Sequence, residues 1–343
     1  MKHRNVSLFV PHEGCPHACT FCNQKAISGK THPLTVGDIR TACETALQSD
    51  GYCTEESEIA FFGGSFTAIE TEKQILYLQT ANEYIGEGKF GSIRISTRPD
   101  CINEEILAVL KQYNVRNVEL GAQSMSDEVL LANRRGHTAK DTENAVRLLR
   151  THGFGVGLQM MTGLYGSTAE TDSFTACEFV RLQPDTVRIY PTAVLEHTAL
   201  AQLYQSGAYR PQTEEQAIIS CSRLLRLFYE NDIPVIRLGL HAGGDVQGNL
   251  LAGVFHPAFG ELCEGEIYYE AMCNSLHGAP EGRYTVYVTP RAFSQAVGQK
   301  KKNIIRLAAQ GYLCRVAADV HIPKYRVRTV AERTDETEEN ECI

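Results

Sequence analysis

The stretch HEGCPHACTFCNQ, His12 to Gln24, places Cys15, Cys19 and Cys22 at C-x3-C-x2-C spacing near the start of the chain. Three cysteines this close do not make a disulfide framework, whereas crowded thiolates bind a metal or a cluster. A [4Fe–4S] cluster usually takes four cysteine ligands, so three would leave one iron open to a small chelating molecule. The alternative is a Cys3His zinc site with His12 or His17 as fourth ligand. Zinc ribbons present two separated C-x2-C pairs, and the sequence has no second pair.

The composition is that of a packed globular protein. The chain has 343 residues, 43% of them hydrophobic, enough for one large α/β domain and a small module. No run of about 18 apolar residues occurs, and no signal-peptide pattern follows Met1, so we expect no membrane partner. Nine further cysteines are scattered, several in apolar helical patterns where cysteine acts as a small hydrophobe. We therefore expect reduced thiols and a cytoplasmic protein.

Charge is unevenly distributed along the chain. The formal net charge is −8, yet residues 283–328 contain ten Lys or Arg against the single acid Asp319. That segment carries +9 and the rest of the chain −17. The basic segment indicates a polyanionic partner.

Short β-like runs alternate with amphipathic segments after the cysteines. The predicted strands cover residues 5–10, 58–62, 92–97, 115–121, 154–161 and 185–190. The predicted helices cover residues 35–48, 70–86, 103–112, 138–152, 168–182 and 213–231. Strands separated by single helices form βαβ units around a parallel sheet. Six units predict an α/β fold, a partial (β/α)6 TIM-type barrel with its chemistry at the C-terminal ends of the strands.

Glycines and polar residues gather at those strand ends. The second predicted strand runs into FGGSF (62–66), whose two glycines let the backbone approach a ligand closely. The next three strands end in STRPD (96–100), in ELGAQS (119–124) followed by NRRGHT (133–138), and in QMMTGLYG (159–166). Each could be an ordinary turn, but four on one rim beside a three-cysteine loop indicate a binding site.

From Val10 to about Pro191 the chain resembles the radical S-adenosylmethionine (SAM) enzymes, of which C-x3-C-x2-C is the signature. It is most similar to the radical-SAM half of the Elongator catalytic subunit and more distantly to the oxygen-independent coproporphyrinogen oxidases. The matching stretches are 15–22, 63–66, 97–100, 118–124, 133–138, 163–166 and 188–192. No acetyl-CoA-binding domain like that of the Elongator subunit is recognised. The resemblance implies a [4Fe–4S] cluster and SAM as cofactors.

The resemblance also implies roles for individual residues. Cys15, Cys19 and Cys22 would hold the cluster, and Phe21 would pack near the adenine. The other implied cofactor contacts are Gly63, Gly64 and Ser65 at the methionine amino group, Gln123 at the ribose, Arg135 at the methionine carboxylate, and Gln159 at a further polar position near the ribose.

Two departures from the family pattern accompany these matches. Ser96 stands where close relatives have a carboxylate, so one expected methionine contact differs. Thr162 and Tyr165 replace prolines of the fifth-strand motif, which would reshape the adenine side of the site.

The implied chemistry is one-electron reduction of SAM, which releases methionine and a 5′-deoxyadenosyl radical that attacks the substrate. This requires an electron donor such as flavodoxin or ferredoxin. RNA, and tRNA in particular, is the preferred substrate because of the Elongator resemblance and the basic segment. The alternatives are a small-molecule or tetrapyrrole substrate, and a non-catalytic protein that only binds the cluster or the cofactor.

The sequence predicts four regions. Residues 1–240 form the radical-SAM partial barrel with a helical extension, and 241–282 form a loop and helix connection that could face the substrate. Residues 283–330 form a small basic α+β module, and 331–343 an acidic disordered tail. In the module, Lys300, Lys301 and Lys302 precede an apolar helical pattern, where exposed N–H groups favour anions. We predict that they contact nucleic-acid phosphate, the alternative being a solvated lysine run.

Overall fold

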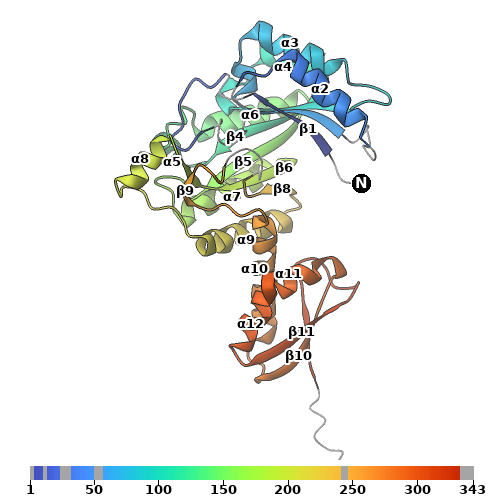
Figure 1. Ribbon diagram of the computed structural model, residues 1–343, viewed down its shortest axis with the longest axis vertical. Coiled ribbons are helices and arrows are strands. Elements are labelled where there is room, and N and C mark those ends of the chain that lie inside the picture. Colours follow the sequence, from blue (N-terminus) through green and yellow to red (C-terminus); the bar gives the residue numbers. More distant parts are fainter. Residues whose placement is uncertain (1–3, 11–13, 24–31, 50–56, 241–245, 333–343) are drawn as a thin grey trace, which may run out of the picture. The chain divides into compact units, whose positions relative to one another are not determined.

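The computed structural model describes residues 4–10, 14–23, 32–49, 57–240 and 246–332 (Figure 1). The chain divides into two compact units, of which the first comprises Met1–Ala217 and Leu227–Pro257. The second comprises Ile218–Arg226 and Ala258–Ile343. None of the described helices is both long and apolar enough to span a bilayer.

A seven-stranded sheet forms the first unit. In spatial order its strands are β1 (Arg4–Val10), β2 (Ser57–Gly63), β3 (Ser92–Thr97), β4 (Val115–Gln123), β5 (Gly155–Thr162), β6 (Thr186–Pro191) and β8 (Val235–Leu238). Every neighbouring pair is parallel. The sheet curls into a half-barrel, which confirms the predicted partial TIM-type barrel. The strand β8 extends the six predicted strands by pairing with β6.

Helices cover the outer face of this sheet (Figure 1). They are α2 (Val36–Leu47), α3 (Thr71–Asn82), α4 (Glu104–Gln112), α5 (Asp127–Ala132), α6 (Ala139–Thr151) and α7 (Ala169–Leu182). Capping boxes at Thr35, Thr138 and Thr168 satisfy N–H groups in the first turns of α2, α6 and α7. Alternate strand residues such as Ile59 and Ile93 are fully buried, and they form the core between sheet and helices.

Shorter elements follow β6, and the sequence did not predict most of them. The strands β7 (Ala193–Leu195) and β9 (Leu250–Gly253) pair antiparallel, and α8 (Ala199–Gln205) follows β7. The predicted long helix is present as α9 (Glu214–Glu230).

Two 3-10 turns, η1 (Phe66–Ala68) and η2 (Pro99–Cys101), lie just after β2 and β3.

The second unit is a small α+β module, as predicted. Its elements in chain order are α10 (Phe259–Leu276), β10 (Gly282–Val288), η3 (Pro290–Ala292), α11 (Phe293–Val297), η4 (Gln299–Lys301), α12 (Lys302–Ala308), β11 (Tyr312–Ala318) and β12 (Arg328–Ala331). The strand β10 lies between a parallel β11 and an antiparallel β12. Its Tyr284, Val286 and Val288 point into a core with Ile267 and Leu307 of the helices.

Candidate functional site

The cysteine loop is fastened to two strand-end segments of the first unit. The backbone N–H of Thr20 donates to the Asn133 carbonyl at 3.2 Å, and its hydroxyl donates to the Asn133 side chain at 2.8 Å. The carbonyl of Thr20 accepts the N–H of Leu200 in α8 at 2.8 Å. The side chain of Asn23 donates to the Glu196 carbonyl at 2.9 Å. The loop therefore lies between the segment after β4 and the segment after β7.

Two glycines make room for this loop. Gly14 has a φ of +69°, and a Cβ there would lie 2.2 Å from the Ser65 carbonyl oxygen. Gly136 has a φ of +70°, and a Cβ there would lie 2.3 Å from the His17 imidazole. Both distances are far inside van der Waals contact, so neither position accepts a side chain while the loop keeps its place.

Arg135 joins the cysteine loop to the strand ends. Its guanidinium donates to the Cys19 thiol at 3.1 Å through Nη1 and to the Gly121 carbonyl through Nη2. The side chain is buried, with 6% exposed. Arg98 supports it from β3, because Nη2 of Arg98 donates to the Arg135 carbonyl while Asp100 holds the Arg98 guanidinium at 2.9 Å. A hydrogen bond from Arg98 to Arg135 thus connects the STRPD and NRRGHT motifs.

Several buried polar atoms of the strand-end motifs have no partner among the described residues. They include Arg135 Nε, His137 Nδ1, Gln123 Oε1 and Ser96 Oγ. Arg135 Nη2 and Gln123 Nε2 both flank Gly121, because a Cβ on that glycine would lie 3.6 Å and 3.0 Å from them. Gln123 adopts a positive φ of 68°, a backbone strain that is common at ligand sites. Buried unpaired polar groups are costly, so this cluster indicates a place for a polar ligand.

The GGSF segment lies next to the loop. Gly63 has a φ of +105°, and the N–H of Gly64 donates to the Val10 carbonyl at 2.7 Å. Ser65 is buried, and its hydroxyl oxygen lies 3.8 Å from the Cys15 sulfur. The backbone of this segment therefore follows the end of β1 closely, at the point where the cysteine loop begins.

Phe21 packs against an apolar cluster that includes Leu200 and Ala201 of α8. That cluster contains Val194, Leu200 and Tyr209, and Tyr165 of the fifth-strand motif also packs against it. The tyrosine that replaces a family proline thus shares this cluster with Phe21.

A chain of ion pairs lies on the inner face of the half-barrel. It is formed by strand side chains that point away from the helix-covered core. Glu119 of β4 accepts from Arg94 at 3.2 Å, from Arg188 at 2.7 Å and from Gln159 at 2.8 Å. Arg94 also donates to Glu58 at 2.7 Å. The guanidinium carbon of Arg188 lies 5.0 Å from the centroid of the Phe62 ring, across the curl of the sheet. We call Glu58, Arg94, Glu119, Gln159 and Arg188 the inner-face network.

The network perturbs the ionisation of its members. Burial by itself raises the pKa of Glu58, but the Arg94 guanidinium and hydrogen bonds from Asn117 and Ser92 together lower it below its usual value. Sequence reasoning missed these ion pairs and assigned Gln159 to the ribose. In the structure the Gln159 amide N–H is engaged by Glu119.

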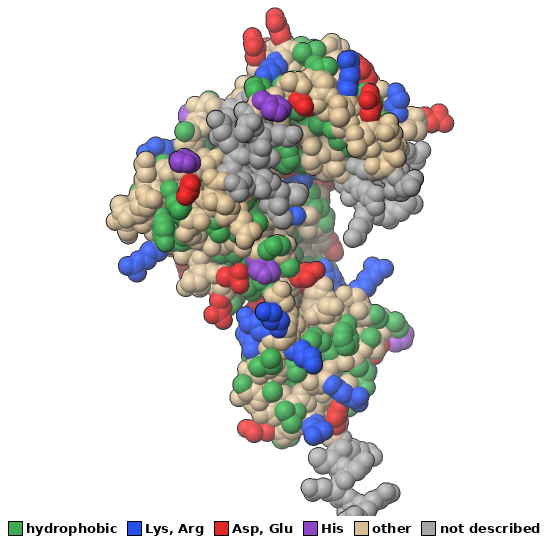
Figure 2. Space-filling view, viewed as in Figure 1, with side chains coloured by type: hydrophobic (Ala, Val, Ile, Leu, Met, Phe, Trp, Pro, Cys, Tyr) green, Lys and Arg blue, Asp and Glu red, His purple; other side chains and the backbone are tan. Residues whose placement is uncertain are grey.

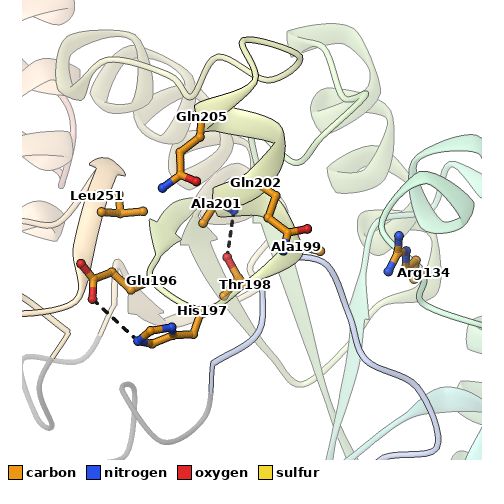
Figure 3. A pocket seen from close by; sticks show the side chains of 9 residues that line it. All are labelled: Arg134, Glu196, His197, Thr198, Ala199, Ala201, Gln202, Gln205 and Leu251. Atoms are coloured by element: carbon orange, nitrogen blue, oxygen red, sulfur yellow. Dashed lines mark hydrogen bonds and ion pairs between the residues drawn. The ribbon is translucent and has the colours of Figure 1, made fainter.

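A cavity of about 610 Å³ opens beside the cysteine loop (Figure 3). It is lined by Arg134, Glu196, His197, Thr198, Ala199, Ala201, Gln202, Gln205 and Leu251. In Figure 3 the Glu196 carboxylate and the His197 ring face each other, with oxygen and Nε2 3.9 Å apart. The Thr198 hydroxyl caps α8 by accepting the Ala201 N–H at 3.0 Å. Most of these residues come from α8 and the turn before it, which no sequence pattern marked.

Several predictions concern metal ligation and residues outside the described ranges. No group of three or more His, Cys, Asp or Glu side chains in the described ranges is close enough to hold a single metal ion. This holds for Cys15, Cys19 and Cys22 as well as for His17, so it does not distinguish the zinc alternative from the cluster, and His12 lies outside the described residues. The ten cysteines that the structure describes form no disulfide. Residues 241–245 and the tail from 333 also lie outside the described part.

The three lysines lie at the start of α12. Lys300 and Lys301 belong to η4 and have positive φ values of 52° and 61°, and Lys302 begins the helix. Among the described residues none of the three forms an ion pair, and their contact with phosphate stays a prediction.

Comparison with known proteins places these features in a family. A family model of the radical SAM superfamily matches residues 9–174, and a model of the radical SAM C-terminal domain matches residues 184–269. A tRNA uridine(34) acetyltransferase of Methanocaldococcus infernus is 32% identical over 256 residues, covering 62% of this chain and 47% of its own length. Elongator complex protein 3 of Mus musculus is 28% identical over 283 residues, covering 72% of this chain and 51% of its own.

The chain spans about half the length of the curated relatives it matches. A solved structure of the archaeal Methanocaldococcus infernus Elp3 with an N-terminal deletion matches the fold. Its TM-score is 0.60 at 25% identity, covering 78% of this chain and 63% of that one. With both family models matched in order on a half-barrel that carries the three-cysteine loop, the chain belongs to the radical SAM superfamily, whose members use a [4Fe–4S] cluster and S-adenosylmethionine.

Proposed function

We propose that this protein is a radical SAM enzyme in which Cys15, Cys19 and Cys22 hold the cluster. The observation that carries the proposal is the position of Arg135, which donates to the Cys19 thiol yet keeps a buried Nε unpaired. Three thiols from one loop fit a cluster with one open iron. An unpaired guanidinium N–H beside an unpaired Gln123 oxygen fits a ligand that carries both a carboxylate and hydroxyl groups.

The remaining contacts to SAM follow from where each residue lies. Arg135 would pair with the methionine carboxylate and Gln123 with the ribose, since both side chains flank Gly121 and each keeps one buried polar atom, Arg135 Nε and Gln123 Oε1, without a partner among the described residues. Gly63, Gly64 and Ser65 would offer backbone at the methionine end, and Phe21 would pack by the adenine. The Gln159 amide donates to Glu119, so Gln159 would contact the ribose only if its amide bonded to both groups.

The two cofactors, when bound, supply a 5′-deoxyadenosyl radical. The chain's own residues orient SAM and exclude water around it. A one-electron donor such as flavodoxin or ferredoxin belongs to the same proposal, because the cluster must be reduced before each cleavage.

We propose tRNA as the substrate. The support is the name of the M. infernus relative, a tRNA uridine(34) acetyltransferase, together with the basic segment of the second unit. The cavity beside the cysteine loop has a volume within the range of small-ligand pockets and could take one nucleotide. A tRNA substrate places the enzyme in the cytoplasm.

The test of the substrate is mass spectrometry of tRNA nucleosides from cells with and without the gene. We expect one modified nucleoside to disappear and to return when the intact gene is restored. A gene copy carrying Cys19→Ala should not restore it. Identical nucleoside profiles in all strains would contradict the tRNA proposal and favour a small-molecule substrate.

The cluster is tested separately, by anaerobic reconstitution with iron and sulfide. The wild type should bind one [4Fe–4S] cluster, and Cys19→Ala should lose its charge-transfer absorption. Cys177→Ala is the matched control, because Cys177 is an exposed cysteine of α7 far along the chain from the loop. Tightly bound zinc without iron–sulfur absorption in the wild type would refute the cluster.

The lysines of the module are proposed to contact phosphate. If they do, RNA affinity falls with salt at a log–log slope near −0.7 per phosphate neutralised on a single strand. Changing Lys300, Lys301 and Lys302 together to Gln should flatten that slope by about two. Wild-type affinity and slope in the triple variant would remove the lysines from the interface, and SAM binding should be unaffected in either case.

A further inference from the structure

The three-stranded sheet of the second unit has one face on which most of the described side chains are exposed, whereas Thr285 is buried and Tyr287 and Ala317 are half-buried. Alternation along β10 sends Tyr284, Val286 and Val288 into the core beneath the helices. The opposite side chains form what we call the open sheet face. Its members are Arg283, Thr285 and Tyr287 of β10, Leu313, Arg315 and Ala317 of β11, and Arg328 and Val330 of β12. In Figure 2 Lys and Arg side chains lie among hydrophobic ones over this unit.

The strand register arranges this face in rows. Tyr287 lies between Ala317 on one side and Arg328 on the other. The guanidinium carbon of Arg328 stands 4.3 Å from the centroid of the Tyr287 ring. In the next row Arg315 Nε donates to the Thr285 hydroxyl at 2.9 Å. Leu313 is 54% exposed and Val330 is 43% exposed, so the face is also partly apolar. The half-buried ring of Tyr287, with Ala317 beside it and the Arg328 guanidinium over it, offers a stacking position in which a base would share the ring with a cation.

Charge on this face favours an anion. It has three arginines and two acids, of which Glu332 lies opposite Arg283 and also accepts a hydrogen bond from the Thr285 hydroxyl at 2.8 Å. Asp319, just after β11, pairs with Arg328 at 3.0 Å, and Glu332, just after β12, pairs with Arg315 at 2.5 Å. Arg283 forms no ion pair among the described residues. Both pairs are exposed on their arginine side, with 52% and 73% of the side chain accessible, so a phosphate could compete for these guanidinium groups.

Two of the acids of α10 are paired with other cations of this unit. Glu266 pairs with Arg306 of α12 at 2.5 Å, and Glu264 pairs with Lys324 at 2.9 Å. By contrast, the 400 Å³ pocket that Lys300 and Lys301 line also contains the carboxylate-bearing Glu261. The open sheet face therefore combines three arginines with a stacking ring, whereas the lysine pocket has a carboxylate in its lining.

We propose that the open sheet face binds a single-stranded segment of RNA, with a base stacked at Tyr287 and the backbone phosphates held by Arg283 and Arg315. This inference rests on the proposed RNA substrate. Unpaired bases are required because only they expose a flat surface to an aromatic side chain. Arginine suits the phosphates because its planar fork matches their oxygens. Binding there would hold the RNA by a unit that carries none of the proposed cofactor ligands.

The test is fluorescence anisotropy with a labelled single-stranded oligouridine, an RNA duplex of the same length, and an unmodified tRNA transcript. The wild type should bind the single strand more tightly than the duplex. Tyr287→Leu should weaken single-strand binding by about 10- to 100-fold, the usual range for loss of one stacking residue. Tyr287→Phe, which keeps the ring, should bind like the wild type. Tyr229→Leu, the same change at an exposed tyrosine of α9, is the control.

A second variant protects the test against a folding defect at Tyr287. Arg283→Gln combined with Arg315→Gln changes only exposed side chains and should flatten the salt slope by about 1.4, corresponding to two phosphates on a single strand. Wild-type binding and slope in both the tyrosine and the arginine variants would refute the open sheet face and leave the tRNA proposal standing. If the wild type binds no RNA at all, and the nucleoside profiles are also unchanged, both proposals fail.

Discussion

The inner-face network and the open sheet face are both polar sides of a sheet, and both are rich in arginine. On the inner face Arg94 and Arg188 are largely buried and share the carboxylate of Glu119. On the open sheet face the arginines are exposed, and two of them pair with acids. Arginine therefore has a different role on each of the two faces. A buried guanidinium is held by its carboxylate and maintains the barrel, whereas an exposed one can exchange that carboxylate for a ligand.

The largest effect that tests this contrast is expected at Glu119. Glu119→Ala leaves two buried guanidinium groups without their shared carboxylate, which should cost about 3–5 kcal/mol of unfolding free energy. Chemical denaturation monitored by circular dichroism measures it. The control is Glu83→Ala, which removes a carboxylate that is half exposed and paired with Arg40, and which should cost about 0–1 kcal/mol. Equal losses in the two variants would show that burial does not distinguish these ion pairs.

A buried carboxyl without a cation sharpens the same contrast. Burial raises the pKa of Asp172 from 3.8 to about 6, although the N–H of Gly163 donates to it at 2.9 Å. The folded state then holds this proton more tightly than the unfolded state. Stability from this group is fully present below about pH 4 and is lost as the pH rises to about 6, by about 3 kcal/mol. Asp172→Asn should remove that loss from the pH dependence of the unfolding free energy.

The control for this prediction has the opposite sign. A backbone hydrogen bond from Thr138 lowers the pKa of Asp141, so its contribution is present at neutral pH and is lost as the pH falls through the lowered value. Asp141→Asn should therefore flatten the acid side of the profile. A wild-type profile in Asp172→Asn would show that Asp172 does not titrate as its burial implies.

Arg135 is an intermediate case between the inner-face network and the open sheet face. It is buried like the inner-face arginines, but it has no carboxylate partner among the described residues. If Arg135 pairs with the methionine carboxylate, the charged hydrogen bond contributes about 1.5–3 kcal/mol. Arg135→Ala should then weaken SAM binding by about one to two orders of magnitude, measured by calorimetry on the anaerobically reconstituted protein. Arg147→Ala, on the exposed side of α6, removes the same charge as a control. An unchanged dissociation constant with the cluster intact would exclude Arg135 from the site.

The smallest effect is expected on the open sheet face. Arg315 is 73% exposed on its side chain, so Arg315→Gln should change the unfolding free energy by no more than about 0.5 kcal/mol. Thermal unfolding followed by circular dichroism measures this. A loss comparable to that of Glu119→Ala would mean that the Arg315–Glu332 pair maintains the module and does not serve a ligand.

Much of the half-barrel was predictable because its signals are local. Threonines at Thr35, Thr138 and Thr168 mark helix starts, and the runs between the helices have strand length. The strands β7 and β9 were not predicted, because three- and four-residue strands leave no periodic pattern. The strand β8 is outside the six predicted strands, and its pairing with β6 across the long helix α9 has no local signal.

The site shows the same limit. The three cysteines lie close together in the sequence, so the cluster ligands could be proposed from their spacing alone. Glu58, Arg94, Glu119 and Arg188 are separated by 25 or more residues, and only the curl of the sheet brings them together. One signal was available. Strands of a parallel sheet covered on both faces are usually continuous apolar runs. In SEIAFFG (57–63) and SIRIST (92–97), by contrast, polar or small residues alternate with apolar ones in the first half of the strand.

Gly14 and Gly136 have a consequence for how this protein would look in a mutational screen. Gly14 belongs to the cysteine loop, and a methyl group there would clash with the Ser65 carbonyl. A methyl group on Gly136 would clash with the His17 ring of that loop, and both glycines have positive φ values. Neither has a side chain that could bind, donate or react. A survey scored by activity would nevertheless mark both positions as essential, on a par with the cysteines. Measuring the cluster content together with the activity would separate the glycines from the cysteines. A glycine substitution displaces the loop, whereas a cysteine substitution removes a proposed cluster ligand.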